Sequence, residues 1–207
     1  MRVLITGSTG LLAKGFEETA SPKDEIVGLH LRTYQVKDPR ASHLTLDVRD
    51  KAAVDALFAR ERFDAVIHAA GLASVDHIEK HPKEGRASNL GGTLNLIEAC
   101  RRAGTYLVYV STNAVFDGTK APYAEDAPTN PPHRYGRIKL ECERAVAERA
   151  GPHAIVRPIL MYGWNHGVNR PNPVTWVYEK LMRGEGVSLV DDVFENPLQY
   201  HQCGRGF

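Results

Sequence analysis

Apolar runs of strand length alternate with helical patterns along most of the chain, and this alternation constrains the fold more than any other feature. Strands are expected at Arg2–Thr6, Glu25–His30, His43–Asp47, Ala65–Ala70, Tyr106–Thr112 and Ala154–Pro158. Helices are expected between them at Leu11–Thr19, Lys51–Arg60, Arg86–Ala103 and Arg134–Ala150. Such alternation predicts βαβ units, and therefore a parallel sheet with helices on both of its faces.

The first of these strands ends in the loop TGSTGLLA, which opens the first helix. Gly7 permits a tight turn, Gly10 lets a pyrophosphate approach the backbone, and the small Ala13 keeps the helix close to the sheet. Phosphates would then meet the free N–H groups and the positive dipole end of that helix. A plain strand-to-helix turn is the alternative, but the position at the start of a βαβ series favours a dinucleotide site made by Gly7, Ser8, Thr9, Gly10, Leu11 and Leu12.

The end of the second strand bears on the choice of dinucleotide. An acidic residue there would hold the ribose 2′-hydroxyl of NAD, and a nearby arginine would accept the 2′-phosphate of NADP. The sequence VGLHLR offers His30 and Arg32 and no acid, so it favours NADP(H), with NAD(H) as the second candidate. Alternatively, Arg32 is a solvated surface charge and the protein takes either cofactor.

Two further strand ends would complete the cofactor site. Asp47 and Val48 close the third strand, where a carboxylate could meet the adenine. Small residues close the fourth strand and leave room for a flat cofactor against the backbone, namely Ala69, Ala70 and Gly71. Both positions lie at the carboxyl ends of strands, where open α/β sheets bind their ligands.

The stretch from Ser111 to Lys139 joins the fifth strand to the following helix and contains three residues that could act together. Tyr135 and Lys139 are four apart and so lie on one face of a helix, while Thr112 lies at the tip of the strand. A lysine cation one turn away would lower the pKa of the phenol, which is ordinarily about 10. Such a group could protonate a carbonyl oxygen while a hydride is transferred. By chance alone, many helices also carry this Tyr–Lys spacing.

Composition excludes several classes of protein. Of 207 residues 43% are hydrophobic and 25% charged, with a net charge of +1, which is typical of a globular domain and not of a nucleic-acid-binding protein. No apolar run approaches the roughly 20 residues of a membrane helix, and no signal peptide precedes the first strand. Cys100, Cys142 and Cys203 are expected to be reduced structural thiols of a cytoplasmic protein. His77 and His81 have zinc-ligand spacing without an evident third ligand, so no metal is expected.

The motifs TGSTGLLA, HAAG, STNAVFDG and YGRIK, in this order, resemble those of the extended short-chain dehydrogenase/reductases, the NAD-dependent epimerase/dehydratase family. Within that family, the segments VFDGTKAPYAEDAPTNPPHRYGRIKLECE and FENPLQY look most like dTDP-4-dehydrorhamnose reductases. The resemblance covers essentially the whole chain. Two positions depart from the family pattern: Asn113-Ala114 stands where rhamnose-type reductases usually have Asp-Tyr, and Ala13 replaces a third glycine.

The resemblance implies roles for the matching residues. Tyr135 would be the general acid, Lys139 would bind the nicotinamide ribose, and Thr112 would orient the carbonyl. Pro158, with Arg157 before it, would lie near the nicotinamide, and Asn89 would support the active-site backbone and a proton relay. The remaining cofactor contacts would come from the glycine loop and the strand ends described above.

We therefore predict a Rossmann-type doubly wound α/β domain over residues 1–160, with strand order 3-2-1-4-5-6, and a partial substrate-binding region over residues 161–207. That second region is expected to contain a helix near Val174–Arg183 and a strand near Val187–Val190. Family relatives continue well beyond this point, so the chain is expected to be truncated at its C-terminus.

The predicted function is NAD(P)H-dependent reduction of a keto group on a nucleotide-linked sugar. An NAD-dependent nucleotide-sugar epimerase or dehydratase is the second hypothesis, although His30 and Arg32 count against it. The third is a non-catalytic reductase-like subunit, because the family includes the regulatory subunit of methionine adenosyltransferase. A homodimer through the helices Arg86–Ala103 and Arg134–Ala150 is also considered.

Overall fold

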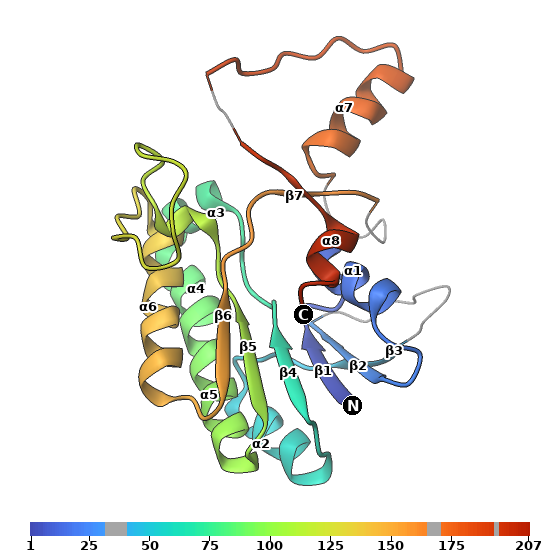
Figure 1. Ribbon diagram of the computed structural model, residues 1–207, viewed down its shortest axis with the longest axis vertical. Coiled ribbons are helices and arrows are strands. Elements are labelled where there is room, and N and C mark those ends of the chain that lie inside the picture. Colours follow the sequence, from blue (N-terminus) through green and yellow to red (C-terminus); the bar gives the residue numbers. More distant parts are fainter. Residues whose placement is uncertain (32–40, 165–170, 193–194) are drawn as a thin grey trace.

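A computed structural model describes residues 1–31, 41–164, 171–192 and 195–207, and a six-stranded parallel sheet lies at its centre (Figure 1). The strands follow the order β3-β2-β1-β4-β5-β6, which confirms the predicted fold class and strand order. Their bounds are β1 (Arg2–Thr6), β2 (Glu25–His30), β3 (Ala41–Thr45), β4 (Ala65–His68), β5 (Tyr106–Val110) and β6 (His153–Val156).

Parallel pairing brings the carboxyl ends of all these strands to one edge of the sheet. Thr6 at the end of β1 pairs with Leu29 of β2 on one side and with His68 of β4 on the other. The chain passes from β1 to β2 and β3, and then returns to place β4 on the opposite side of β1. The crevice at such a reversal is where open α/β sheets bind ligands.

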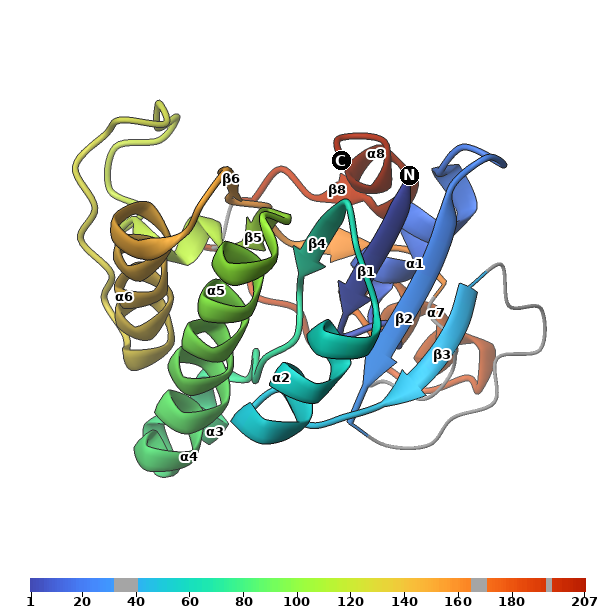
Figure 2. The same cartoon turned by 90° about the horizontal axis from the view of Figure 1, so that it is seen from below.

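One face of the sheet is covered by α2 (Lys51–Arg60), α5 (Gly92–Ala103) and α6 (Arg134–Arg149), as Figure 2 shows. The apolar stripes of these helices and the inward side chains of the strands form one continuous core. Its buried members include Leu4, Val66 and Leu107 from the strands and Leu57, Leu96 and Val146 from the helices.

The other face is covered by α1 (Leu11–Thr19) and by α8 (Tyr200–Gly204), which comes from the far end of the chain. The two helices meet backbone to backbone, because a Cβ added at Gly15 would lie 2.1 Å from the carbonyl oxygen of Tyr200. Beside this contact, the Glu18 carboxylate accepts hydrogen bonds from Tyr200 Oη at 2.9 Å and from His201 Nε2 at 2.5 Å.

The connection from β4 to β5 is less regular than predicted. It contains α3 (Val75–Lys80), α4 (Pro82–Arg86) and a π-helical turn, η1 (Ala87–Gly91), before α5 begins. The prediction of one uninterrupted helix over Arg86–Ala103 is therefore wrong at its start. Two successive glycines, Gly91 and Gly92, weaken the regular helix at this place, and π turns of this kind occur frequently at functional sites.

After β6 the chain forms a short two-stranded parallel ladder, β7 (Met161–Tyr162) with β8 (Leu198–Gln199), and the helix α7 (Pro173–Met182). Figure 1 shows α7 standing apart from the sheet. The helix was predicted, but a strand near Val187–Val190 is wrong: this segment is irregular and largely exposed, and no strand among the described residues pairs with it. The division of the chain at residue 160 stays a prediction.

Most strand starts and most helix ends agree with the sequence, whereas most strand ends do not. The helices at Leu11–Thr19 and Lys51–Arg60 are confirmed to the residue. Strands β3 to β6 end two residues before the predicted positions. The extended chain continues past some of these ends, because the Leu46 amide still donates to the His30 carbonyl at 2.9 Å and the Ser111 amide to the Val156 carbonyl at 2.7 Å. Thr112, for example, keeps extended angles (φ −163°, ψ 151°) beyond the end of β5. Among the described helices, none is long and apolar enough to span a membrane.

Candidate active site and cofactor crevice

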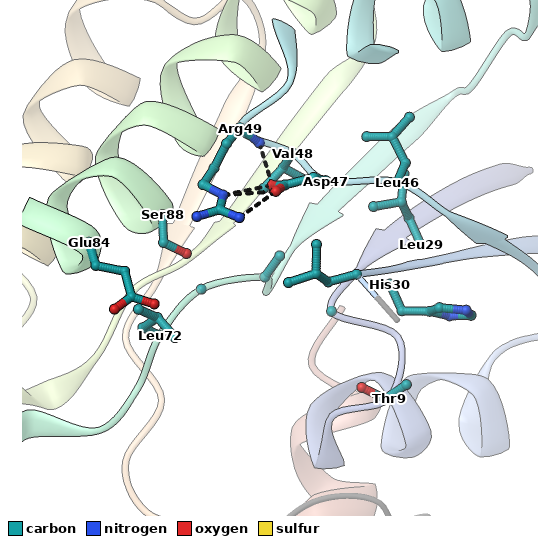
Figure 3. Close-up of a pocket in the computed structure, with 14 residues that line it drawn as sticks. Thr9, Leu29, His30, Leu46, Asp47, Val48, Arg49, Leu72, Glu84 and Ser88 are labelled. Carbon is teal, nitrogen blue, oxygen red and sulfur yellow. Dashed lines mark hydrogen bonds and ion pairs between the residues drawn. The ribbon is translucent and has the colours of Figure 1, made fainter. Parts of the chain in front are cut away.

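A cavity of about 220 Å³ lies at the carboxyl ends of β1, β2 and β4 and beside the segment that follows β3 (Figure 3). It brings together many of the residues predicted to bind a cofactor, although they come from distant parts of the sequence. The predicted residues that line it are Gly7, Thr9, His30, Asp47, Val48, Ala70 and Gly71. Leu29, Leu31, Leu46, Arg49, Leu72, Glu84 and Ser88 complete the lining.

The glycine loop has the close approaches that its sequence predicts. Gly7 adopts a left-handed conformation (φ +74°), and a Cβ there would lie 3.0 Å from the Ala70 amide nitrogen. A Cβ on Gly10 would lie 3.0 Å from the Gly7 carbonyl oxygen. Gly10 is also the N-cap of α1, and no side chain in the described part of the chain caps this helix, so its first amides remain available to an anion. These features fit a dinucleotide pyrophosphate beside Leu11 and Leu12.

Ser8 belongs to the glycine loop, but its side chain turns away from the cavity. It is fully buried, and its Oγ lies 3.1 Å from His30 Nδ1 and 3.4 Å from His43 Nδ1. His30 is only 5% exposed, and burial lowers its pKa, which favours the neutral ring over a phosphate-binding cation. Arg32, the other residue predicted to select NADP, lies outside the described residues.

Asn89 does not point into the cavity but fastens the loop that follows β4. Its Oδ1 accepts a hydrogen bond from the Leu72 amide at 2.7 Å, and its Nδ2 donates one to the Leu72 carbonyl at 2.9 Å. A Cβ on Gly71 would lie 2.7 Å from the same Oδ1. Asn89 therefore positions the backbone of the cavity wall from the π turn η1, which agrees with a supporting role and not with direct cofactor contact.

A chain of buried hydrogen bonds through His68 joins β1, β4 and α5. His68 Nδ1 lies 2.7 Å from Thr6 Oγ1, which also accepts a hydrogen bond from the Ala70 amide at 3.1 Å. On the other side, His68 Nε2 lies 3.0 Å from Thr93 Oγ1, which donates to the Asn89 carbonyl at 2.6 Å. Burial lowers the pKa of His68 to about 3, so the ring is a neutral connector and not an acid–base group.

The three residues predicted to be catalytic meet at the end of β5. Thr112 caps a 3₁₀ turn, η2 (Asn113–Val115), by accepting a hydrogen bond from the Ala114 amide at 3.1 Å, and its hydroxyl is near enough to Tyr135 to influence the pKa of the phenol. The sequence did not single out Gly136, although this residue makes the approach of α6 feasible. A Cβ on Gly136 would lie 2.3 Å from the Ala114 carbonyl oxygen, so only glycine lets Tyr135 come this close to the turn.

Lys139 is buried one turn further along α6. Its Nζ donates to the Val110 carbonyl at 2.5 Å and lies 4.4 Å from the ring centroid of Tyr109. Burial lowers the pKa of Lys139 to about 8. The expected lowering of the Tyr135 pKa is wrong here: burial raises the pKa, more strongly than the nearby Thr112 hydroxyl lowers it. The lysine ammonium is engaged by the Val110 carbonyl and the Tyr109 ring.

Arg157 and Pro158, which directly follow β6, support the same region. The Pro158 carbonyl accepts a hydrogen bond from the Asn113 amide at 3.1 Å, which fixes the turn beyond Thr112. Arg157 makes two hydrogen bonds, of 2.9 and 2.7 Å, with the buried carboxylate of Glu143 on α6. Glu143 also accepts a hydrogen bond from Ser111 Oγ. Sequence reasoning missed Glu143, because no motif or spacing singles it out.

The two histidines with zinc-ligand spacing lie on the surface beside α4. Their rings are 4.6 Å apart, and His77 Nε2 lies 3.0 Å from a Glu84 carboxylate oxygen. Within the described part of the chain, no three metal-binding side chains come together as a group.

Residues 1–205 match the family model described as the RmlD substrate binding domain. The chain belongs to this family. The match, together with the reductases among the relatives below, confirms the predicted relation to dTDP-4-dehydrorhamnose reductases.

Two kinds of protein are among the relatives. Methionine adenosyltransferase 2 subunit beta of Xenopus tropicalis is 37% identical over 163 residues, which are 78% of this chain and 47% of that protein. The dTDP-4-dehydrorhamnose reductase of Streptomyces griseus is 32% identical over 197 residues, covering 95% of this chain and 60% of the enzyme. The chain thus spans about half the length of these curated relatives.

A solved structure of dTDP-4-dehydrorhamnose reductase from Bacillus anthracis, in complex with NADP, has the same fold. Its TM-score is 0.83 at 27% sequence identity, and the match covers 99% of this chain and 68% of that structure.

Proposed function

We propose that the chain carries the cofactor-binding and proton-donating half of an NAD(P)H-dependent reductase that acts on a keto group of a nucleotide-linked sugar, as dTDP-4-dehydrorhamnose reductases do. The observation that carries the proposal is that the Thr112 hydroxyl influences the Tyr135 phenol directly, one helical turn from the buried Lys139. These groups lie at the same edge of the sheet as the cavity beside Gly7.

The nicotinamide, when bound, would supply the hydride that reaches the keto carbon. Tyr135 Oη would give its proton to the keto oxygen, and Thr112 would orient that oxygen. The raised pKa of Tyr135 keeps the phenol protonated before reaction, as a proton donor requires. Lys139, whose pKa is about 8, is mostly a cation at neutral pH and would hold the nicotinamide ribose while stabilising the phenolate that proton transfer leaves.

NADP(H) is the proposed cofactor, with NAD(H) as the alternative. The NADP complex of the Bacillus anthracis relative supports this choice, as does the absence of an acid in the sequence VGLHLR at the end of β2. The buried thiols of Cys100, Cys142 and Cys203 favour a cytoplasmic location. A second copy packing on α5 and α6 would give a homodimer.

Turnover of a dTDP-4-keto-6-deoxysugar with NADPH, followed at the nicotinamide absorbance, tests the reductase proposal. Tyr135→Phe should lower turnover by about 10²- to 10⁴-fold while NADPH still binds, because only the proton donor is lost. Tyr106→Phe, at the exposed start of β5 and so at the opposite edge of the sheet, is the matched control and should leave turnover unchanged. Turnover should also fall as pH rises through about 8, where Lys139 loses its charge. Normal turnover in Tyr135→Phe would remove Tyr135 from the mechanism.

A second candidate function is that of a non-catalytic subunit of a methionine adenosyltransferase. The 37% identity to the Xenopus subunit beta favours it. Mixing the chain with a methionine adenosyltransferase catalytic subunit, followed by size-exclusion chromatography with light scattering, tests this role. A stable complex, together with absent reductase turnover in the wild type, would favour the subunit over the enzyme.

A further inference from the structure

Lys139 is a buried amine that forms no ion pair with a carboxylate in the described part of the chain. The residue is only 9% exposed, and its Nζ donates to the Val110 carbonyl at 2.5 Å. Removing an ammonium from water costs free energy unless nearby groups compensate its charge. An ammonium has three N–H donors, and the neutral Val110 carbonyl accepts from only one of them.

The carboxylate on the same face of α6 belongs to Glu143, one helical turn after Lys139. Arg157 donates to its two oxygens at 2.9 and 2.7 Å, and Ser111 donates to it as well. Glu143 raises the pKa of Lys139 through its charge, but it does so from beyond ion-pair distance. The positive charge of Arg157 opposes that attraction, so Glu143 compensates only part of the lysine charge.

The other titratable groups around the amine carry no negative charge at neutral pH. On α6 they are the phenol of Tyr135 and the thiol of Cys142, and burial raises the pKa of both. On β4 the group is His68, which is neutral because burial lowers its pKa to about 3. On β5 it is Tyr109, whose pKa burial also raises. A charged Lys139 therefore needs a compensating group that is not an anion.

The ring of Tyr109 supplies such a group. Lys139 Nζ lies over this ring, 4.4 Å from its centroid. A cation within about 6 Å of an aromatic centroid is attracted by the negative face of the ring, and the attraction is larger when both groups are removed from water. Tyr109 is only 1% exposed, and its strand β5 pairs with β4 on one side and β6 on the other. The ring is therefore held firmly in place.

We propose that Tyr109 is a positioning residue: the face of its ring, together with the Val110 carbonyl, holds the Lys139 ammonium one helical turn from Tyr135 and favours its charged form. Two N–H donors of the ammonium then remain for the nicotinamide ribose. Tyr109 acts only through Lys139 and touches neither substrate nor cofactor. The inference rests on the role of Lys139 in the proposed function.

Titration of Lys139 by NMR tests the inference without any turnover. In the full chain with isotope-labelled lysine, the Cε chemical shift follows loss of the ammonium proton, and Lys139→Met identifies the signal. Tyr109→trifluoro-Phe, whose ring fluorines remove the negative face but keep the shape, should lower the Lys139 pKa by about one pH unit. Tyr109→Phe keeps the ring face and should stay within about 0.3 pH units of wild type. Equal Lys139 pKa values in the Phe and trifluoro-Phe variants would overturn the inference.

Phe58→trifluoro-Phe is the matched control. Phe58 is a buried ring of the same core, beside Phe63, and lies in α2 away from α6. Fluorination there should leave the Lys139 pKa unchanged, and circular dichroism should show the same fold in all variants. A Lys139 pKa that falls equally in the Phe58 control would assign the effect to disturbance of the core and overturn the inference.

The pH dependence of turnover separates positioning from general damage. In Tyr109→trifluoro-Phe, turnover should fall about one pH unit earlier on the alkaline side than in Tyr109→Phe. The two variants should have kcat values within about twofold of each other near pH 6, where Lys139 is charged in both. A similar loss at every pH would indicate structural damage and overturn the inference.

Two outcomes distinguish this inference from the proposed function. Wild type that reduces no sugar, but whose Lys139 titration depends on the Tyr109 ring, would support the inference and remove the reductase role. Wild type that reduces the sugar, with a Lys139 titration that is insensitive to ring fluorination, would overturn the inference and leave the reductase role intact.

Discussion

In the six-stranded sheet the large apolar side chains are buried on both faces, whereas after β6 many of them are open to solvent. Leu4 and Leu107 are fully buried in the sheet, while Leu181 and Met182 of α7 are 58% and 69% exposed. The helix α8 also follows β6 but is packed, because its backbone contacts α1 directly at Gly15. Apolar residues are buried where a second layer of structure covers them. The helix α8 packs against α1 and the sheet, whereas α7 stands apart from the sheet.

The largest expected difference between the two regions is in the cost of losing one leucine side chain. Leu107→Ala opens a cavity in the core and should lower the free energy of unfolding by about 2–5 kcal/mol. Leu189→Ala makes the same chemical change at a side chain that is 67% exposed, and should cost less than about 0.5 kcal/mol. Urea unfolding followed by circular dichroism measures both, and equal losses would contradict the contrast.

The buried carboxyl of Glu17 on α1 should make the stability of the sheet region depend on pH. Burial raises the pKa of Glu17 to about 7 from an ordinary value of 4.5, so the folded state holds a proton that the unfolded state releases between these values. Stability should therefore fall as pH rises from about 4.5 to 7. Glu17→Gln should remove this dependence and be more stable than wild type at pH 8 by about 1–3 kcal/mol.

Urea unfolding at pH 5 and pH 8 tests this expectation. Glu148→Gln on the exposed surface of α6 is the control, and it should follow wild type at both values. A wild type whose stability is the same at pH 5 and pH 8, or a Glu17→Gln variant that keeps the full pH dependence, would show that Glu17 is ionised in the fold.

The contact between α1 and α8 joins the two regions, and a single methyl group should separate them. Gly15→Ala would place its Cβ 2.1 Å from the Tyr200 carbonyl, so α8 must move away while α1 gains helix propensity. The net change in global stability should stay within about 1 kcal/mol, but hydrogen exchange at residues 200–204 should accelerate. Unchanged protection there would mean that α8 tolerates the shift without undocking.

The smallest effect is expected at the tryptophans, which both lie after β6. Trp164 is 57% and Trp176 is 36% exposed, so their emission reports the C-terminal region alone. Trp176→Phe should change the free energy of unfolding by less than about 0.5 kcal/mol.

In wild type, the change in tryptophan fluorescence should occur at lower urea concentration than the change in circular dichroism. Coincident transitions would show that both regions unfold as one unit.

The sequence predicted the sheet well because its elements are specified locally. The alternation of strand and helix patterns predicted a parallel sheet, the Rossmann-type assignment added the strand order, and the helices at Leu11–Thr19 and Lys51–Arg60 agree to the residue. The C-terminal elements β7, β8 and α8 were missed because each is very short and forms only through distant partners. A local pattern contains no information about such pairing.

In the candidate site, too, local patterns were predicted and contacts between distant residues were missed. The glycine loop and the Tyr135–Lys139 spacing are short-range patterns, and the structure brings their residues to one edge of the sheet. The sequence missed Gly136 and Tyr109, because their importance depends on what lies opposite them: the Ala114 carbonyl and the Lys139 ammonium. The pKa of Tyr135 was predicted in the wrong direction, since burial is not visible in helix spacing.

The hydrogen-bond chain through His68 has a fixed polarity. Because Thr93 gives its proton to the Asn89 carbonyl, His68 must carry its proton on Nε2, and Thr6 must donate to Nδ1. Thr6 Oγ1 can then accept a hydrogen bond from the Ala70 amide. That amide is therefore not free to donate to a ligand. A ligand lying against Ala70 meets a wall without that donor, so negative charge in the crevice is directed to the open end of α1.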